Sequence, residues 1–324
     1  MAIADADTLS SEHRTLLEAC GLLDRSERGK LALTGRDAAE FLNGQVTNEL
    51  MTLRPGEGRY AVFLTHKGKM LGDLRILAVG EGEQPSELLL DTERASLQTL
   101  FDMIRRFKVG FDVELHKRTL DRGLLSLIGP GAAEMAGAVL PDVEHANAPT
   151  EIGHVEALAV RTDVGIDLIC DAADTDELAG RLRERGAITV SEQATEVLRV
   201  EHGRPRFGLD LDETVIPQEA GLNERAVSFT KGCYVGQETV ARLHYRGKPN
   251  RHLRGLRLSE PAAYGEELRL GERPVGRLGS TAISPRLGPI ALALVRREAE
   301  PGAIVSVGEH GASAEVLTLP FSLG

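Results

Sequence analysis

Apolar residues recur at helical spacing in several segments of the first 250 residues. In the segment 93–108, Leu97, Leu100, Ile104 and Phe107 follow one another at intervals of three or four positions, which is typical of an amphipathic helix. Shorter helical patterns occur at 12–23, 35–42, 132–140, 178–185, 192–202 and 238–244. Because these segments alternate with strand-like runs, the chain is expected to have an α+β fold.

The strand-like runs of this region are short and apolar. The clearest pair, 59–64 and 74–79, flanks a glycine-containing turn and predicts a hairpin. Further strands are expected at 86–91, 109–115, 124–128, 155–161 and 165–170. This order predicts two successive α+β units, which lie either side by side around one sheet system or in separate lobes.

After about residue 250 the pattern changes to short strands that are punctuated by glycine and proline. Such runs occur at 253–258, 268–270, 275–278, 290–295, 304–307 and 314–319, with no helical pattern between them. Many short strands with frequent turns indicate a small sandwich or barrel. We therefore expect three parts, at 1–120, 121–250 and 251–324.

Composition removes several classes of protein. Lys and Arg number 38 against 49 Asp and Glu, and the net charge of −11 argues against a nucleic-acid scaffold with a basic surface. The longest aliphatic run, 290–295, is far below the roughly 20 residues of a membrane helix. Residues 1–7 lack the basic and apolar parts of a signal peptide. We therefore expect no membrane partner and no direct nucleic-acid partner.

The chain has three cysteines, Cys20, Cys170 and Cys233, and they lie far apart. A disulfide framework is not expected, nor is a resident metal or iron–sulfur site, which usually takes four ligands. The expected compartment is a reducing cytoplasm. Functional interest therefore falls on a single thiol.

The most unusual segment is residues 231–238, with the sequence K-G-C-Y-V-G-Q-E. Gly232 and Gly236 lie four positions apart, which indicates a backbone that needs positive φ or a close approach. Cys233 stands beside Lys231 and before a predicted helix, and this arrangement favours the thiolate form of a cysteine. A packed Cys233 in a left-handed turn is the structural alternative.

Charged residues form three further patterns. Residues 231–257 hold seven Lys or Arg against the single acid Glu238, which suits an anionic ligand or, alternatively, a solvated helix face. Strand alternation places Asp73 and Arg75 on one face, where they could bind a zwitterionic ligand or pair with each other. Glu201, His202, Arg204 and Arg206 form a polar cluster that equally suits a site or the end of a helix.

The K-G-C-Y-V-G-Q-E segment resembles the hallmark of the YgfZ-type folate-binding proteins. Residues 215–218, 41–48 and 319–323 also look like this family, so the resemblance covers nearly the whole chain. The family is similar in fold to the aminomethyltransferase of the glycine cleavage system. The resemblance implies two intertwined α+β domains and a C-terminal antiparallel β-barrel around a central channel.

The resemblance implies a tetrahydrofolate-binding accessory protein for iron–sulfur cluster assembly or repair, with an indirect effect on tRNA modification. Its partners would be a folate and iron–sulfur client or assembly proteins. Cys233 would be the functional thiol. The rest of its loop would bias the thiol or hold it in place, through Lys231, Gly232, Tyr234, Gly236, Gln237 and Glu238. Folate would contact Asp73, Arg75 and Arg242.

Two other functions stay open at this point. The aminomethyltransferases carry two adjacent acids where this chain has Gly72 and Asp73, and a glycine-rich segment is shortened around 162–167. The alternative to the accessory role is a folate-dependent aminomethyltransferase or other one-carbon transferase, for which Asp73 would be essential. A third possibility is an interaction module in which folate binding is vestigial.

Overall fold

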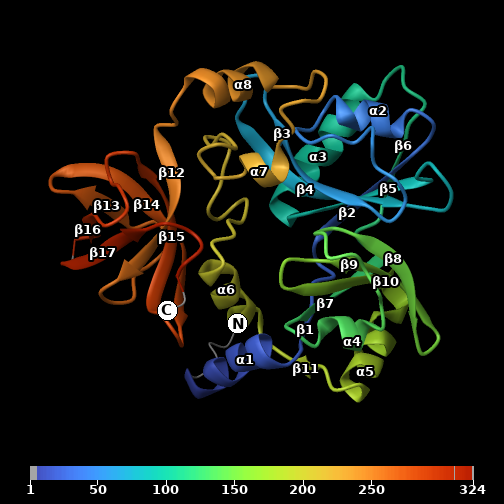
Figure 1. The fold of residues 1–324 in the computed structure, drawn as a ribbon, viewed down its shortest axis with the longest axis horizontal. Helices are drawn as coiled ribbons and strands as arrows, with labels where there is room; N and C mark the ends of the chain where they lie inside the picture. Colours follow the sequence, from blue (N-terminus) through green and yellow to red (C-terminus); the bar gives the residue numbers. More distant parts are fainter. Residues whose placement is uncertain (1–5, 310, 323–324) are drawn as a thin grey trace.

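The computed structural model describes residues 6–309 and 311–322, which form two sheets with their helices and a barrel (Figure 1). Residues 1–5, on which part of the signal-peptide expectation rests, and Leu323 of the closing motif lie outside the described residues. Within the described ranges, none of the helices combines the length and the apolar composition that a membrane crossing requires.

The first sheet has five strands in the order β3-β4-β5-β2-β6, all paired antiparallel. They are β2 (Gly29–Thr34), β3 (Gly58–Leu64), β4 (Met70–Val79), β5 (Glu87–Thr92) and β6 (Glu114–Lys117). Two helices, α2 (Ala38–Asn43) and α3 (Arg94–Phe107), bury apolar side chains against these strands. The predicted hairpin is confirmed as β3 and β4, whose register places Val62 opposite Asp73.

The second sheet has six strands in the order β11-β1-β7-β10-β9-β8. They are β1 (Gly21–Asp24), β7 (Arg122–Ile128), β8 (Asn147–Ile152), β9 (Val155–Arg161), β10 (Gly165–Asp171) and β11 (Ile188–Thr189). Strand β1 pairs with β7 and β11, although it precedes the whole first sheet in the chain. The two sheets are therefore intertwined, as the resemblance implies.

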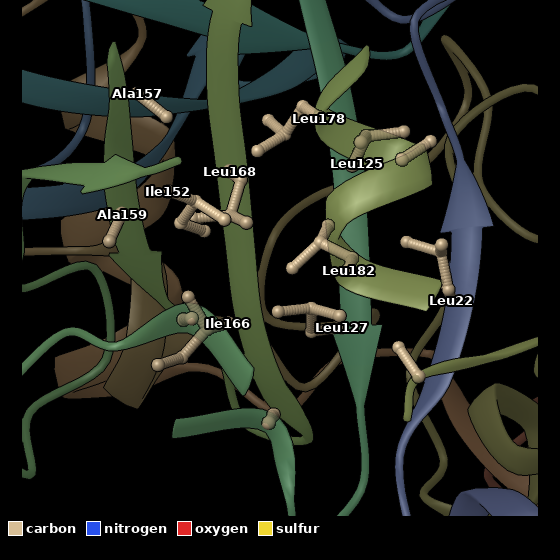
Figure 2. Close-up of a cluster of buried hydrophobic side chains, with 14 of the residues drawn as sticks. Leu22, Leu125, Leu127, Ile152, Ala157, Ala159, Ile166, Leu168, Leu178 and Leu182 are labelled. Carbon is tan, nitrogen blue, oxygen red and sulfur yellow. The ribbon is translucent and has the colours of Figure 1, made fainter. Parts of the chain in front are cut away.

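Helices cover the second sheet and extend from it. They are α1 (Ala6–Glu18), α4 (Ala132–Ala136), the 3₁₀ turn Ala172–Asp174, α5 (Thr175–Glu184) and α6 (Glu192–Glu201). Figure 2 shows Leu178 and Leu182 of α5 beside Leu125 and Leu127 of β7, in a core that is nearly free of exposed surface. The predicted helix 132–140 is too long, because Gly137 adopts a left-handed conformation and ends α4.

The segment between α6 and the barrel is mostly irregular and carries two helices, α7 (Asn223–Ala226) and α8 (Gln237–Arg246). Tyr234 and Val240 pack with Val62 and Met70 of the first sheet in one buried cluster. Residues late in the chain therefore cover the β3–β4 hairpin, and Figure 1 shows α8 above this sheet.

Six strands close the C-terminal barrel in the order β12-β15-β14-β13-β16-β17. They are β12 (Arg251–Leu258), β13 (Glu267–Leu270), β14 (Arg273–Ser284), β15 (Gly288–Arg296), β16 (Ile304–Val307) and β17 (Ala312–Leu317). Their inward apolar side chains form a separate core. The expected antiparallel barrel is confirmed, since each of these strand pairs is antiparallel.

Candidate functional site

A cavity of about 200 Å³ lies where the two sheets meet the chain around α6. Strands β4, β5, β7 and β10, helix α6 and the turn between β1 and β2 all contribute to its wall. The charged side chains on this wall are Arg25, Arg28, Arg75, Arg199, Arg204, Arg225, Asp73, Asp91, Glu93, Glu144, Asp163 and Asp167. Such a concentration of ionisable groups in a hollow is typical of a binding or catalytic site.

Asp73, on β4, is a carboxylate of this wall without a cationic partner. Its side chain is buried, and the Tyr60 hydroxyl donates a hydrogen bond to Oδ2 at 2.5 Å. Among the described residues it forms no ion pair. Burial raises the pKa of Asp73 to about 6, and the Tyr60 hydrogen bond opposes this shift only in part.

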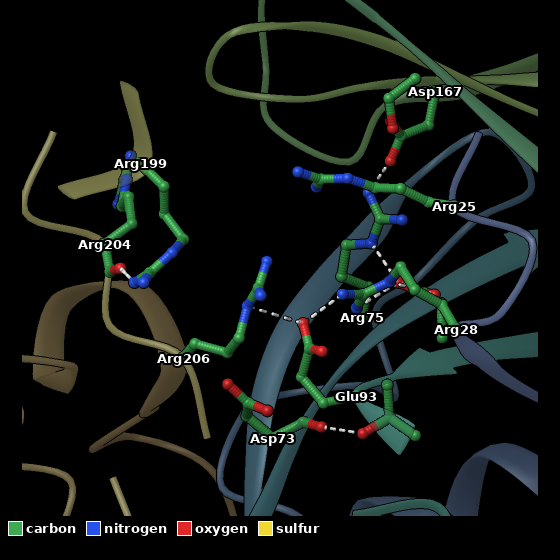
Figure 3. A network of polar contacts seen from close by, with 12 residues as sticks. Arg25, Arg28, Asp73, Arg75, Glu93, Asp167, Arg199, Arg204 and Arg206 are labelled. Carbon is green, nitrogen blue, oxygen red and sulfur yellow. Dashed lines mark hydrogen bonds and ion pairs between the residues drawn. The ribbon is translucent and has the colours of Figure 1, made fainter. Parts of the chain in front are cut away.

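Arg75 lies two residues further along β4 and also lines the cavity, but it does not pair with Asp73. Its Nε donates to Oδ2 of Asp91 at 2.7 Å, and its Nη1 donates to Oδ2 of Asp167 at 2.6 Å. Asp91 is also held by Arg28, at 2.8 and 3.0 Å. Figure 3 shows Arg28 and Arg75, which share this acid, close together. Arg75 therefore forms ion pairs with two protein carboxylates, one from each sheet, and so connects the two sheets.

Arg242, the third residue expected to contact folate, lies on the exposed surface of α8. It is not part of the cavity wall. The structure thus brings Asp73 and Arg75 together and leaves Arg242 apart from them.

The 231–238 loop lies outside this cavity and is anchored by Lys231. Its buried ammonium donates to the carbonyl oxygens of Asn43, Val46 and Asn48, at 2.7, 2.9 and 2.6 Å. Burial lowers the pKa of Lys231 to about 8. Three carbonyl oxygens accept from the Lys231 ammonium, which has three N–H donors, so Lys231 ties the loop to the 43–48 segment.

The other loop residues have distinct surroundings. Tyr234 is buried in the core beside β3, whereas Cys233 and Glu238 are exposed. The Gln237 side chain donates to the Gly232 carbonyl oxygen at 3.3 Å. The predicted positive φ is found at Gly236 and not at Gly232. Exposed Cys233 does not match the packed-residue alternative.

Thiol labelling of the folded protein is expected to stop at one equivalent. Cys233 is exposed, while Cys20 and Cys170 are buried. Burial raises the pKa of Cys20 to about 11 and also raises that of Cys170, so the reactive thiolate is scarce at both sites. A chromogenic disulfide reagent at pH 8 measures the stoichiometry. Labelling of three thiols without denaturant would contradict the burial of Cys20 and Cys170.

The two glycines of the loop give a matched pair of substitutions. Gly236 has φ +86°, and a Cβ there would lie 2.6 Å from the Thr65 carbonyl oxygen. Gly236→Ala is therefore expected to destabilise the protein by about 1–3 kcal/mol. Gly232→Ala meets no atom within 4 Å, and its effect is expected to stay within about 0.5 kcal/mol. Urea unfolding compares the two, and equal effects would refute the assigned loop geometry.

Several residues of the cavity wall carry no sequence signal of their own. Arg28 lies in a turn, and Asp91 lies near the end of β5, an apolar strand whose pairing with β4 is not visible in the sequence. The polar cluster after α6 is divided: His202 and Arg204 line the cavity, but Glu201 does not. Buried Glu201 instead lies 3.0 Å from the His13 ring nitrogen and accepts from Ser284.

In residues 6–309 and 311–322, no group of three or more His, Cys, Asp or Glu side chains is placed to hold a metal ion. The cavity offers a buried carboxyl group with a raised pKa, beside a neutral phenol and a set of guanidinium groups.

Comparison with known proteins adds the family. Residues 4–231 match the model of the GCVT N-terminal domain family. A protein of Corynebacterium aurimucosum named aminomethyltransferase is 31% identical, over 97% of this chain and 90% of that protein. One of Streptomyces avermitilis with the same name is 32% identical, over 96% and 88%. The glycine cleavage system aminomethyltransferase T of Bartonella henselae superposes with a TM-score of 0.85 at 23% identity, covering 97% of this chain and 89% of that one.

These findings confirm the expected fold and correct the expected function. The superposition confirms the aminomethyltransferase fold. The relatives span nearly the whole chain and are named aminomethyltransferase, so the prediction of an iron–sulfur assembly or repair factor is wrong. The associated iron–sulfur partners and the indirect effect on tRNA modification lose their support with it.

Proposed function

The chain belongs to the GCVT N-terminal domain family, and from this premise we propose that it is a folate-dependent aminomethyltransferase or a closely related one-carbon transferase. Tetrahydrofolate, the ligand expected from the sequence, agrees with membership of this family. The match covers 90% and 88% of these relatives, so the proposal draws on nearly their whole length rather than on one of their domains.

Asp73 carries this proposal. Transfer of an aminomethyl group makes a bond from the transferred carbon to a folate nitrogen and breaks its bond to the donor. The proton that leaves the folate nitrogen is gained by the leaving group of the donor. A carboxyl group whose pKa lies near 6 can accept and return this proton close to neutral pH.

The surroundings of Asp73 suit this role. The pKa of Tyr60 is raised far above its usual value, mainly by burial and by the Asp73 carboxylate, so its phenol stays neutral and holds the carboxylate in place. The reduced pterin ring presents adjacent N–H donors, for which a carboxylate is the matching acceptor. Arg75 would act by holding Asp91 and Asp167, which shape the wall across both sheets.

We assign no step of this reaction to the 231–238 loop, because none of its residues lines the cavity. Arg242 is left out of the proposed site for the same reason. The resemblance to the YgfZ-type proteins stays a prediction that rests on this loop. We propose the cytoplasm as the compartment, since the three cysteines are free and one of them is exposed.

Incubation of the purified chain with tetrahydrofolate and an aminomethyl donor tests the proposal. We expect a one-carbon folate product and the free leaving group in equal amounts, and no product when folate is omitted. Folate binding without product would refute the transferase. Absence of both binding and turnover would favour the interaction module.

A further inference from the structure

The charged groups of the cavity wall have partners of opposite charge, with two exceptions among the described residues. Four guanidinium groups lie within ion-pair distance of acids on the wall: Arg28 with Asp91 and Glu93, Arg75 with Asp91 and Asp167, Arg204 with Asp163, and Arg225 with Glu144. Arg199 is held by Glu196 and Asp210. Within the part of the chain that the structure describes, Arg25 and Asp73 are left without a partner of opposite charge. The wall therefore has one unpaired cation and one unpaired acid.

Arg25 lies in the turn between β1 and β2, and its side chain is poorly satisfied. Its Nη2 lies 3.4 Å from the Thr195 hydroxyl, and its Nε is buried with no hydrogen-bond partner. In Figure 3 the guanidinium group of Arg25 points away from Arg28, toward the side of the view where Arg199 lies. An arginine does not lose its charge in a protein, so an anionic ligand is the partner that this half-buried guanidinium group would bind most strongly.

Glu196 is the acid whose pKa is influenced by the charge of Arg25, but it already pairs with other guanidinium groups. The pKa of Glu196 is lowered in spite of its burial, because Arg199 donates to its carboxylate and Arg206 and Arg25 lie nearby. Arg206 lies 2.6 Å from Oε1 of Glu196, and Arg199 lies 2.8 Å from Oε2. Both carboxylate oxygens of Glu196 are therefore engaged by other guanidinium groups, and among the described residues no acid lies within ion-pair distance of Arg25.

His145 gives a second and independent sign that the wall is completed by a polar ligand. It is 5% exposed, lines the same cavity, and neither of its ring nitrogens has a hydrogen-bond partner. Its backbone has φ 72°, the one non-glycine residue with positive φ in the described ranges. Buried polar atoms without partners and strained backbone are unusual outside functional sites.

We propose that Arg25 binds a carboxylate group of the ligand that occupies this cavity, which makes it a specificity-determining residue of the site. The inference deepens the proposed transferase and rests on it for the identity of the ligand. A guanidinium group binds a carboxylate through two parallel N–H···O bonds, and both partners lose water in the cavity. The carboxylate comes either from the glutamate tail of the folate or from the one-carbon donor.

Calorimetry with three probes on the full-length chain separates these sources. The probes are tetrahydrofolate, 6-methyltetrahydropterin, which has no carboxylate, and glycine, which carries an aminomethyl group on a carboxylate. If Arg25 binds the folate tail, Arg25→Met lowers the affinity for tetrahydrofolate about 10- to 100-fold and leaves the affinity for 6-methyltetrahydropterin unchanged. If Arg25 binds the donor, the same substitution lowers the affinity for glycine by that factor and leaves the affinity for tetrahydrofolate unchanged.

Two further variants control the measurement. Arg25→Lys keeps the charge but not the paired donors, so an intermediate loss is expected. Arg36→Met removes an arginine whose side chain is 80% exposed, and no affinity is expected to change. Because Arg25 has no carboxylate partner, Arg25→Met is not expected to lower the melting temperature, whereas Arg28→Met breaks the pairs with Asp91 and is expected to lower it.

Three results would overturn the proposal: unchanged affinity of Arg25→Met for both carboxylate probes, an equal loss for all three probes, or a wild-type protein that binds neither carboxylate probe. These results are independent of turnover. A wild-type protein that shows the Arg25-dependent binding but forms no one-carbon product would refute the transferase and keep the carboxylate site.

Discussion

Asp73→Asn is expected to lower kcat of the proposed transfer by about 10²- to 10⁴-fold, the range that a positioned acid–base group contributes. Asparagine keeps the size of the side chain and an oxygen for the Tyr60 hydrogen bond, but it cannot carry the proton. Steady-state kinetics with tetrahydrofolate and an aminomethyl donor measures the loss. Asp121→Asn, which changes an exposed acid, is the matched control and should leave kcat unchanged.

The pH dependence of the wild type identifies the same group. The form that accepts a proton is the carboxylate, so activity should rise with pH through about 6 and level off above it. The remaining activity of Asp73→Asn should lack this rise. A variant that keeps both its rate and its acidic limb would show that another group carries the proton.

Stability separates a chemical role of Asp73 from a structural one. Its pKa in the folded protein, about 6, is higher than the value of about 3.9 in an unfolded chain. The folded state binds the Asp73 proton more tightly than the unfolded chain does. The stabilisation that comes from this proton binding is therefore present below pH 4 and is lost as the pH rises through 6. At pH 7, Asp73→Asn is therefore expected to be as stable as the wild type or more stable, by up to about 2–3 kcal/mol.

Asp91→Asn is expected to destabilise the fold by about 3–5 kcal/mol, because it removes the buried acid that two guanidinium groups share and leaves each of them with a single acid. Asp91 has no exposed surface and binds both Arg28 and Arg75. These two guanidinium groups hold the pKa of Asp91 far below its usual range, against the effect of its burial. Urea unfolding at pH 7 measures the difference.

The sign of the pH effect at Asp91 is opposite to that at Asp73. Because the pKa of Asp91 is depressed in the folded protein, its stabilising contribution is present above about pH 4 and is lost as the pH falls further. The control is Glu177→Gln, which breaks an exposed pair with Arg181 and should cost less than about 1 kcal/mol. Equal stability of Asp91→Asn and the wild type would refute a supporting role for the buried pair.

Local patterns predicted the parts of the fold that form between neighbours in sequence. The β3–β4 hairpin and the barrel strands were found because alternation and turn residues act over a few positions. The position of β1 in the second sheet was not predicted, because Gly21–Asp24 is short and pairs with strands about 100 or more residues later. No periodicity within four residues carries that information.

The candidate site shows the same division. Strand alternation placed Asp73 and Arg75 on one face, and both line the cavity, but the carboxylates that hold Arg75 lie 16 and 92 residues away. Arg25 and His145 belong to a turn and a loop without a motif. The Lys231 ammonium serves three carbonyl groups more than 180 residues earlier, a partner set that neighbouring residues could not indicate.

The position of β1 also has a consequence for the newly made chain. The first sheet can close once β6 has left the ribosome, but β1 then still lacks β7, and it lacks β11 until residue 189 is made. At roughly 5–20 residues per second, the apolar run of β1 waits several seconds to tens of seconds with an unpaired edge. The strand β1 therefore stays without its partners for longer than any strand of the first sheet does.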